Sequence, residues 1–436
     1  MQRTAHFEAV EKILTAITLD MGDDGLRASF IFTRPGQHPF LGGAGVEIYY
    51  HDREFIRAVL FVRKHGPLYL RYLPIDEIWR MLQEFVNENF WMLAGEVLFR
   101  KSTGNFAENV SVQTKRDLAE ALLTSPVFSP PRELTLFPLV AVNVTANFDS
   151  PNFFLIAPDA LDETRLPQGV PAAAITRTQF PPLTDWDGRR QIPSAWLGVR
   201  SPAPSVAERQ RAAILGALAL TPLPRYRYHF SGRSAFGGRA TISDRISFQF
   251  GETHIPPMMY DIVVTEADHG WLGLLSEKLG KFEKAIRREL RALEYFYRAW
   301  PQDPSERFPI LCMALDGIFG EAGRAAQAVI DGIRGVFGSH VPNDRLRKLM
   351  DLRAVVVHGS APVVYDSSHF AEYYEKYGVD PIRDMELIVW RCLRDRIFDG
   401  KLKEHADPLA EKCNEMPASG RMPKRIERPS ILDGSQ

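Results

Sequence analysis

Helix start and stop signals follow one another closely between about residues 275 and 405, and this spacing constrains the fold more than any other feature. Asp-Pro pairs at 303–304 and 380–381 are typical of helix starts, because aspartate caps the first N–H groups and proline fits the first turn. Gly359 and Gly400 stand where two of the apolar segments end, as glycine commonly does at a helix end. Strand signals are missing here, so an all-α helical bundle is predicted. The predicted helices cover residues 282–300, 303–320, 322–337, 343–359, 369–377 and 380–400.

The preceding residues, up to about 265, have a different pattern. Short runs rich in β-branched and aromatic residues, bounded by Pro, Gly, Asn or Asp, are typical of strands. Such runs lie at 68–73, 136–144 and 245–250. Apolar residues at three- and four-residue spacing predict helices at 75–93 and 205–220. The second helix opens with Ser205 and Glu208 in the order of a capping box. This region is therefore predicted to be α+β.

The chain length of 436 residues is that of two or three domains. We predict a mixed α+β region over residues 1–265 that senses or positions a partner, and a helical domain over 275–405. The polar tail over 406–436 is expected to be disordered. Proline-rich segments indicate a further division of the first region, near 125–135 or 182–204.

Charge and cysteine content narrow the class of protein. Lys and Arg number 53 against 54 Asp and Glu, so a nucleic-acid contact has to come from a local patch rather than from bulk charge. Cys312, Cys392 and Cys413 are far apart and odd in number, which favours reduced thiols. The start of the chain lacks the apolar core of a signal peptide, and apolar stretches such as 212–220 are short of the ~20 residues that a membrane helix needs. We therefore expect a cytoplasmic location and no membrane partner.

No motif indicates a metal or a cofactor. His229, His254 and His269 lack the spacing of metal ligands, and no Cys-x2-Cys or His-Glu-x2-His pattern occurs. The glycine-rich segments at 42–45 and 232–238 lack the spacing of phosphate-binding or dinucleotide-binding loops. We therefore expect neither metal nor cofactor, and the sequence disfavours ATP, NAD and serine-hydrolase chemistry.

The segment DLRAVVVHGS at 351–360 places Arg353 and His358 at the two ends of an apolar run. A histidine exchanges protons near neutral pH, and an arginine binds phosphate oxygens with a fork of N–H groups. RNA carries its own nucleophile, the 2′-hydroxyl, so such a pair is a minimal set for cleaving a phosphodiester without a metal. The alternative is structural, because the helix dipole favours a histidine in the last turn, and an arginine beside a buried ridge often pairs with an acid.

The helical region from about 280 to 400 resembles the HEPN superfamily, in particular its Apea-like branch, through two motifs. These are ALDGIFG at 314–320 and LRAVVVHG at 352–359. The resemblance implies a HEPN-like bundle in which Arg353 and His358 occupy the family's Arg-x(4–6)-His motif. In active members this motif belongs to metal-independent endoribonucleases that act as dimers. The physiology implied is that of a defence or toxin-type nuclease that stays inactive until it is triggered.

Two positions depart from the family pattern. Ala354 follows the motif arginine, where active ribonucleases commonly carry Asn, Asp or His. Asp316 replaces the glutamate of an Ala-Leu-Glu segment that is frequent in this branch, which keeps the carboxylate on a shorter side chain. Asp316 can orient Arg353 or His358, or serve helix packing or capping.

Two basic segments are further candidates for RNA binding. The first, at 225–239, has no acidic residue, and as a hairpin it either binds single-stranded RNA by phosphate contacts and stacking or presents a solvated basic face. Its basic and aromatic residues include Arg225, Arg227, Arg233, Arg239, Tyr226 and Tyr228. The second candidate comprises Arg287 and Arg291. Its alternative is ordinary pairing, because Glu283 and Glu294 each precede an arginine by four positions.

Two functions follow from these observations. The leading hypothesis is a metal-independent endoribonuclease, a homodimer through the helical domain, in which Arg353 stabilises the phosphate and His358 is the general acid and base. The region over 1–265 would bind a regulatory protein partner. The alternative is a non-catalytic RNA-binding, dimerisation or scaffold protein with a degenerate HEPN domain, which Ala354 favours.

Overall fold

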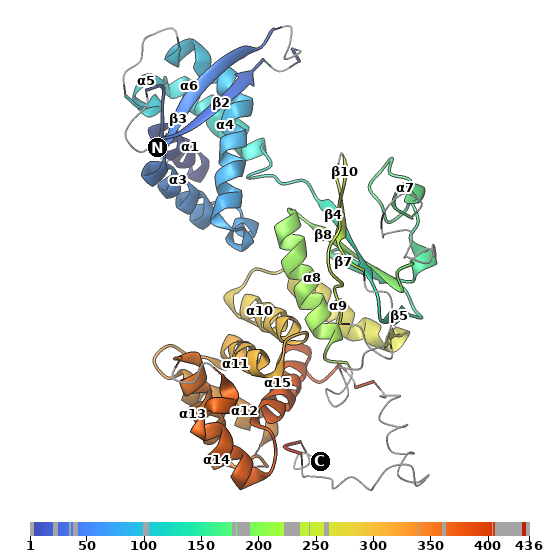
Figure 1. The fold of residues 1–436 in the computed structure, drawn as a ribbon. Helices are drawn as coiled ribbons and strands as arrows, with labels where there is room; N and C mark the ends of the chain where they lie inside the picture. The colour runs from blue at the N-terminus through green and yellow to red at the C-terminus, as the bar shows by residue number, and fades with distance from the viewer. Residues whose placement is uncertain are drawn as a thin grey trace. The chain divides into compact units, whose positions relative to one another are not determined.

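The computed structural model describes the chain in segments. They are residues 4–20, 25–34, 36–37, 42–98, 104–176, 180, 192–221, 236–243, 245–256, 261–338, 340–359, 363–402, 404–405 and 430–432. The chain divides into two compact units, Met1–Arg132 and Glu133–Gln436 (Figure 1). This division falls within the proline-rich boundary predicted near 125–135.

The first unit packs helices against a small antiparallel sheet of strand order β1-β3-β2. Leu26 of β2 lies opposite Tyr50 of β3, and Phe30 lies opposite Val46. The Phe30 ring contacts Phe90 of α4 edge-on, with the ring centroids 5.4 Å apart, which joins the sheet to the helices. The elements are α1 (Ala5–Thr15), β1 (Ile17–Thr18), β2 (Gly25–Phe32), β3 (Ala44–His51), α3 (Asp52–His65), η1 (Leu68–Tyr72), α4 (Ile75–Val97), α5 (Phe106–Asn109) and α6 (Val112–Thr124).

The run LYLRYL, predicted as a strand, instead forms the 3-10 helix η1. Pro67 precedes it and Pro74 follows it, so the run is enclosed between two residues of fixed φ. Tyr69 and Leu70 are adjacent in sequence and both buried, whereas a strand would turn them to opposite faces. The β propensity of the run is therefore overridden by its packing.

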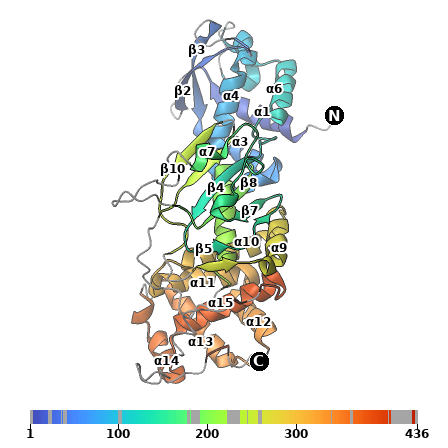
Figure 2. The same ribbon diagram turned by 90° about the vertical axis from the view of Figure 1, so that its right-hand side faces the viewer.

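The second unit contains a six-stranded antiparallel sheet of order β10-β9-β4-β8-β7-β6, in which Figure 2 shows β4, β8 and β7 side by side. Alternate residues of β4 enter two cores. Phe137 and Leu139 face the core shared with the large helices, and Leu134 and Leu136 face a smaller core on the other side. The predicted strand at 136–144 is interrupted at Ala141, whose φ is 60°. The strands are β4 (Glu133–Leu139), β5 (Val142–Val144), β6 (Phe148–Asp149), β7 (Phe153–Ile156), β8 (Ala195–Ser201), β9 (Arg239–Ile242), β10 (Ile246–Gln249) and β11 (Ile262–Val264).

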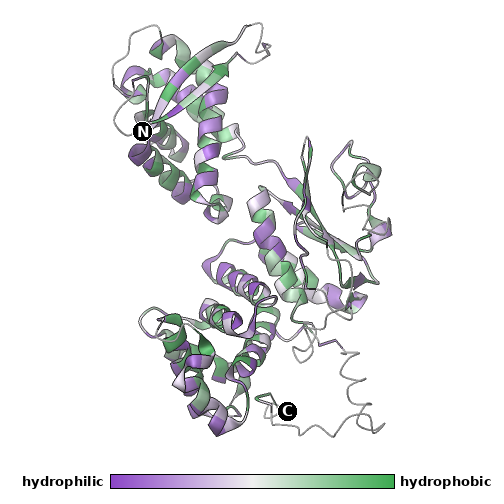
Figure 3. Cartoon of the chain, viewed as in Figure 1, coloured by the Kyte–Doolittle hydropathy of each residue, from purple (hydrophilic) through white to green (hydrophobic). Residues whose placement is uncertain are grey.

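The helices predicted over the last third of the chain are present, and their ends lie within a few residues of the prediction. Figure 3 shows hydrophilic residues along much of α10. The buried apolar residues of the large helices belong to one core cluster. The helices of the second unit are α7 (Ala172–Thr176), α8 (Pro204–Leu218), α9 (His269–Leu279), α10 (Lys284–Ala299), α11 (Pro304–Phe319), α12 (Ala325–Phe337), α13 (Asn343–Val357), α14 (Ser368–Tyr377) and α15 (Pro381–Phe398). Short 3-10 helices are η2 (Pro158–Ala160), η4 (Glu266–Asp268) and η5 (Val364–Asp366).

The boundary predicted between 265 and 275 does not separate two units, because the sheet region and the helical region share one core. At Gly216 of α8, a Cβ atom would overlap the carbonyl oxygen of Leu293 in α10, so these two backbones are in direct contact. The carbonyl oxygen of Leu220 also accepts hydrogen bonds from Trp390 Nε1 at 2.9 Å and from Arg394 Nη1 at 3.0 Å. The residue pattern of neither helix predicts these hydrogen bonds between α15 and the end of α8.

The capping box predicted at Ser205 and Glu208 is not formed. Ala203 is the N-cap of α8, and Pro204 occupies the first turn. The Ser205 hydroxyl is buried without a hydrogen-bond partner. Glu208 instead forms an ion pair with Arg211, three positions along α8, and another with Arg239 of β9, so its carboxylate does not serve a capping box.

The end of the chain contributes to the core of the second unit. Ile431, within the tail predicted to be disordered, is 4% exposed and belongs to the main core cluster. Residues 406–429 and 433–436 lie outside the described segments. The prediction of disorder is therefore corrected at Ile431, because its apolar side chain is buried in the core.

Within the described segments, no helix combines the length and the apolar character that crossing a membrane requires. Cys312 and Cys392 are free thiols buried in α11 and α15, as their positions on the apolar faces of these helices predict. Burial raises the pKa of both thiols. Cys413 lies outside the described residues.

Candidate functional site

Arg353 lies on α13, which packs against α11, and its guanidinium forms an ion pair with Asp316 of α11. The Arg353 side chain is 16% exposed and the Asp316 side chain 30% exposed. Arg353 Nε and Asp316 Oδ1 are both buried without a hydrogen-bond partner. The pair is therefore half-buried and incompletely satisfied, and each partner retains capacity for a further polar contact.

Arg288 of α10 holds the end of the helix that carries Asp316. Its Nε donates to the Gly317 carbonyl at 2.7 Å, and its Nη2 donates to the Gly320 carbonyl at 2.6 Å and to the Asp316 carbonyl at 3.2 Å. The Asp316 carbonyl also accepts from the Gly320 N–H at 3.0 Å. The Gly317 and Gly320 carbonyls lie at the very end of α11, where a helix leaves carbonyls without partners. The arginine thereby fixes the turn from which the Asp316 carboxylate reaches Arg353.

His358 is the C-cap residue of α13 and is exposed. Its backbone N–H donates to the Ala354 carbonyl at 3.0 Å, and Gly359 follows with a positive φ of 78°, which ends the helix. Five helical positions correspond to a rise of ~7.5 Å and a turn of ~140°, so Arg353 and His358 leave the helix in different directions. One chain therefore presents an exposed histidine and a largely covered arginine from the same helix, not a closed pair.

The second RNA-binding candidate, on α10, is engaged in contacts within the chain. Arg291 forms an ion pair with Glu294, three positions along the helix, and lies over the Tyr295 ring at 4.6 Å. Glu294 is buried, and burial raises the pKa of its carboxyl group, while Arg291 opposes this rise. Arg287 is partly buried. The predicted pairing of Glu294 with the arginine four positions later is therefore corrected. Glu294 forms its ion pair with Arg291, three positions earlier on the helix.

Most of the first RNA-binding candidate lies outside the described residues. This holds for Arg225, Tyr226, Arg227, Tyr228 and Arg233. Arg239, from the same segment, is described, and the structure places it at the start of β9. There it lines a pocket of about 340 Å³ that the sequence did not indicate.

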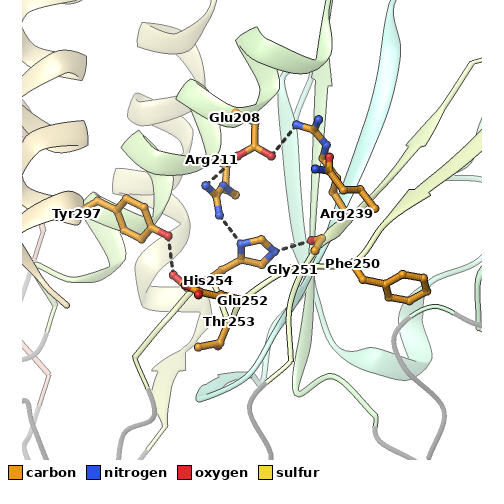
Figure 4. Close-up of a pocket in the computed structure, with 11 residues that line it drawn as sticks. Glu208, Arg211, Arg239, Phe250, Gly251, Glu252, Thr253, His254 and Tyr297 are labelled. Carbon is orange, nitrogen blue, oxygen red and sulfur yellow. Dashed lines mark hydrogen bonds and ion pairs between the residues drawn. The ribbon is translucent and has the colours of Figure 1, made fainter. Parts of the chain in front are cut away.

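This pocket lies within the second unit, where α8, α10, the start of β9 and the chain after β10 meet (Figure 4). Glu208 accepts from Arg211 at 2.8 Å and from Arg239 at 2.7 Å, so one carboxylate holds two guanidinium groups. The Arg211 guanidinium also lies over the rings of Phe137 and Tyr297, at 5.3 and 5.6 Å. The lining residues are Glu208, Arg211, Gly238, Arg239, Gln249, Phe250, Gly251, Glu252, Thr253, His254 and Tyr297.

His254 forms the inner end of this network and is only 7% exposed. Its Nδ1 accepts a hydrogen bond from Arg211, and its Nε2 donates to the Gly238 carbonyl at 2.6 Å. Burial, followed by the charge of Arg211, lowers the pKa of His254 to about 3. The imidazole is therefore neutral at neutral pH, and both of its nitrogens are already hydrogen-bonded within the chain.

The His254 network makes stability depend on pH. An unfolded histidine takes up a proton near pH 6.5, whereas the folded chain keeps His254 neutral down to about pH 3. Between these values the unfolded chain binds the extra proton, so the free energy of unfolding falls as the pH falls, by at most ~1.4 kcal/mol per pH unit from this group. In urea denaturation, the difference in free energy of unfolding between the wild type and His254→Asn should decrease as the pH is lowered from 7.5 to 4.5. A difference that stays constant would contradict the assignment, and His269→Asn is the matched control.

No cluster of three or more His, Cys, Asp or Glu side chains that could hold a metal ion occurs in the described part of the chain. Comparisons with protein-family models, with curated proteins and with solved structures gave no significant match to this chain.

Proposed function

We propose that the chain is a metal-independent endoribonuclease of the HEPN type, and that Arg353 and His358 are its catalytic residues. The observation that carries the proposal is the placement of these residues on α13, with an exposed histidine at the helix end and an arginine beside the Asp316 carboxylate of the second motif. The two motifs of the resemblance, 314–320 and 352–359, are thus joined by an ion pair between α11 and α13.

The chemistry needs only proton transfer and charge stabilisation. A base removes the proton of the RNA 2′-hydroxyl, its oxygen attacks phosphorus, and the bond from phosphorus to the 5′ oxygen breaks as an acid protonates the leaving oxygen. The products are a 2′,3′-cyclic phosphate and a 5′-hydroxyl. His358 supplies a proton-transfer group, and Arg353 stabilises the negative charge on the phosphate oxygens in the transition state.

A homodimer is part of this proposal. Each chain supplies one motif histidine, whereas cleavage benefits from an acid and a base, and a two-fold axis would bring two copies of α13 together. Val357, next to His358, is 48% exposed, and Met313 on the neighbouring α11 is 42% exposed, so apolar surface flanks the site. The proposal also includes a cytoplasmic location and a regulatory protein partner for the N-terminal region.

The second candidate is a protein that binds RNA or dimerises without cleavage. The ion pair between Arg353 and Asp316 favours it, because an RNA phosphate has to compete with a carboxylate already on the arginine. Ala354 favours it as well, since it provides no polar group beside the motif. The two candidates share the same surface and differ in whether bond cleavage occurs there.

The test is incubation of the full-length protein with a mixed RNA pool in the presence of a chelator. Cleavage is expected to leave 2′,3′-cyclic phosphate ends, and an RNA with 2′-O-methyl groups throughout should stay intact because it lacks the nucleophile. Light scattering is expected to give the mass of a dimer. RNA binding without cleavage would support the second candidate, and a monomer that neither binds nor cleaves RNA would contradict both.

A further inference from the structure

We propose that the pocket around Arg211 and Arg239 is a binding site for a phosphorylated sugar, with the arginines recognising the phosphate group. This inference is independent of the ribonuclease proposal, because it concerns other residues of the second unit. The cavity of about 340 Å³ is larger than a bare phosphate ion needs and lies at the lower end of the range for small-molecule sites.

The inner wall of the pocket favours an anion. Two guanidinium groups share the single carboxylate of Glu208 there, and the neutral His254 adds no charge, so this wall carries a net positive charge. The second carboxylate of the lining, that of Glu252, is exposed at the rim. The Arg211 side chain is 17% exposed and the Arg239 side chain is 25% exposed, and both line the pocket. Guanidinium groups recognise phosphate through paired N–H donors.

The arginines are held in place before any ligand arrives. Arg211 lies over two aromatic rings and is bonded to Glu208 and His254, and Figure 4 shows it directed between these two partners. Tyr297 donates from its hydroxyl to the His254 carbonyl at 2.8 Å, which ties α10 to the same wall. Little conformational entropy is then lost when an anion binds, and such preorganisation favours affinity.

The β9 side of the pocket is formed by two backbone segments that lie very close to each other. A Cβ atom on Gly237 would overlap the Glu252 carbonyl, and one on Gly238, whose φ is 94°, would overlap the Gln249 carbonyl. The two glycines therefore let the start of β9 approach the chain that follows β10. This approach places the Gly238 carbonyl on His254 and the Arg239 side chain on Glu208.

The remaining polar groups match sugar hydroxyls better than a second phosphate or a nucleobase. Glu252 is an exposed carboxylate, which repels phosphate but accepts hydrogen bonds from a diol. Thr253 and Gln249 add a hydroxyl and an amide. Neither lining aromatic ring offers a face to a nucleobase inside the pocket. Tyr297 lies against Arg211, and the Phe250 ring, although 54% exposed, points away from His254 in Figure 4.

The experiment is titration calorimetry of the full-length protein with ribose 5-phosphate, with inorganic phosphate, ribose and adenosine monophosphate as comparison ligands. Ribose 5-phosphate is expected to bind with a saturable signal, and at least about tenfold more tightly than ribose or phosphate alone, since each half of the ligand has its own partners. Absence of saturable binding by ribose 5-phosphate, or equal binding of ribose, would overturn the proposal. Tighter binding of the nucleotide would replace the sugar phosphate by a nucleotide and overturn the class.

Variants locate the site. Arg239→Gln is expected to weaken ribose 5-phosphate binding at least about tenfold, because a charge-assisted contact is lost. Arg200→Gln is the matched control, since Arg200 is also 25% exposed, lies on the same sheet and pairs with a carboxylate, that of Asp149. Glu252→Gln on the rim should weaken ribose 5-phosphate but not phosphate, and serves as the test if Arg239→Gln does not fold. Equal binding by the pocket variants and the control would show that the ligand binds elsewhere.

Discussion

Replacing His358 with alanine is expected to reduce RNA cleavage in chelator by about 10²–10⁴-fold, the contribution typical of a positioned general acid or base. The histidine is exposed at the end of α13, so its removal leaves no cavity and should not change the fold. The measurement is the single-turnover rate on an RNA that the wild type cleaves, together with the far-ultraviolet circular dichroism of the variant.

The matched control is His340→Ala, because His340 is also exposed and lies just before the start of the same helix. Its rate is expected to equal that of the wild type. A second comparison is Asp316→Asn, which keeps the shape of the Arg353 partner but removes its charge. If His358→Ala cleaved RNA as fast as the wild type, His358 would have no role in proton transfer, and the ribonuclease proposal would be lost in its present form.

Replacing Asp384 with alanine is expected to lower the free energy of unfolding by about 3–5 kcal/mol, the usual cost of leaving one partner of a buried ion pair uncompensated. Asp384 is 1% exposed and accepts hydrogen bonds from Arg345 Nε at 3.0 Å, from Arg345 Nη2 and from the Tyr373 hydroxyl. It thereby joins α15 to α13 and α14. The measurement is urea denaturation of the full-length variant, followed in the transition of the second unit.

Asp344→Ala is the matched control for this prediction. Asp344 also lies on α13 and also pairs across to α14, with Lys376 at 2.6 Å and Tyr377 at 2.8 Å, but its side chain is 54% exposed. A much smaller loss is expected, because exposed ion pairs are screened by water. Equal losses for the two variants would show that burial does not determine the strength of the Asp384 contact.

Burial and attraction act in opposite directions on Asp384. Burial raises the pKa of its carboxyl group, while Arg345 and the Tyr373 hydroxyl lower it, and burial has the larger effect. The cost of Asp384→Ala is therefore mainly the cost of leaving Arg345 buried without its partner. A double variant that replaces both residues with apolar ones should recover part of the loss.

The helices were predictable because their signals are local. Proline after aspartate at 380–381 begins α15 in the structure, where the Asp380 carboxylate accepts from the Ile382 N–H at 2.8 Å. Gly320 likewise is the C-cap of α11. The strand prediction for residues 68–73 was wrong because the signal there was not local propensity alone. Prolines on both sides and a buried tyrosine outweighed the preference of the run for extended structure.

The candidate site was predictable in its residues but not in its contacts. Residues 353 and 358 stand out by type and spacing, since an arginine and a histidine flank an apolar run. The partner of Arg353 is 37 positions away on another helix, and the choice of Asp316 over His358 depends on how α11 and α13 pack. The burial of Arg353, which decides how freely it can reach a phosphate, has the same origin.

Helix ends in the last third of this protein follow from the local sequence, because caps, prolines and glycines act within a few residues. The union of residues 133–436 in one unit, and the meeting of Arg211, Arg239 and His254 in one pocket, follow instead from tertiary packing. The reason is that these contacts join segments distant along the chain. Whether an arginine is paired, buried or open to a ligand depends on neighbours that local periodicity does not specify.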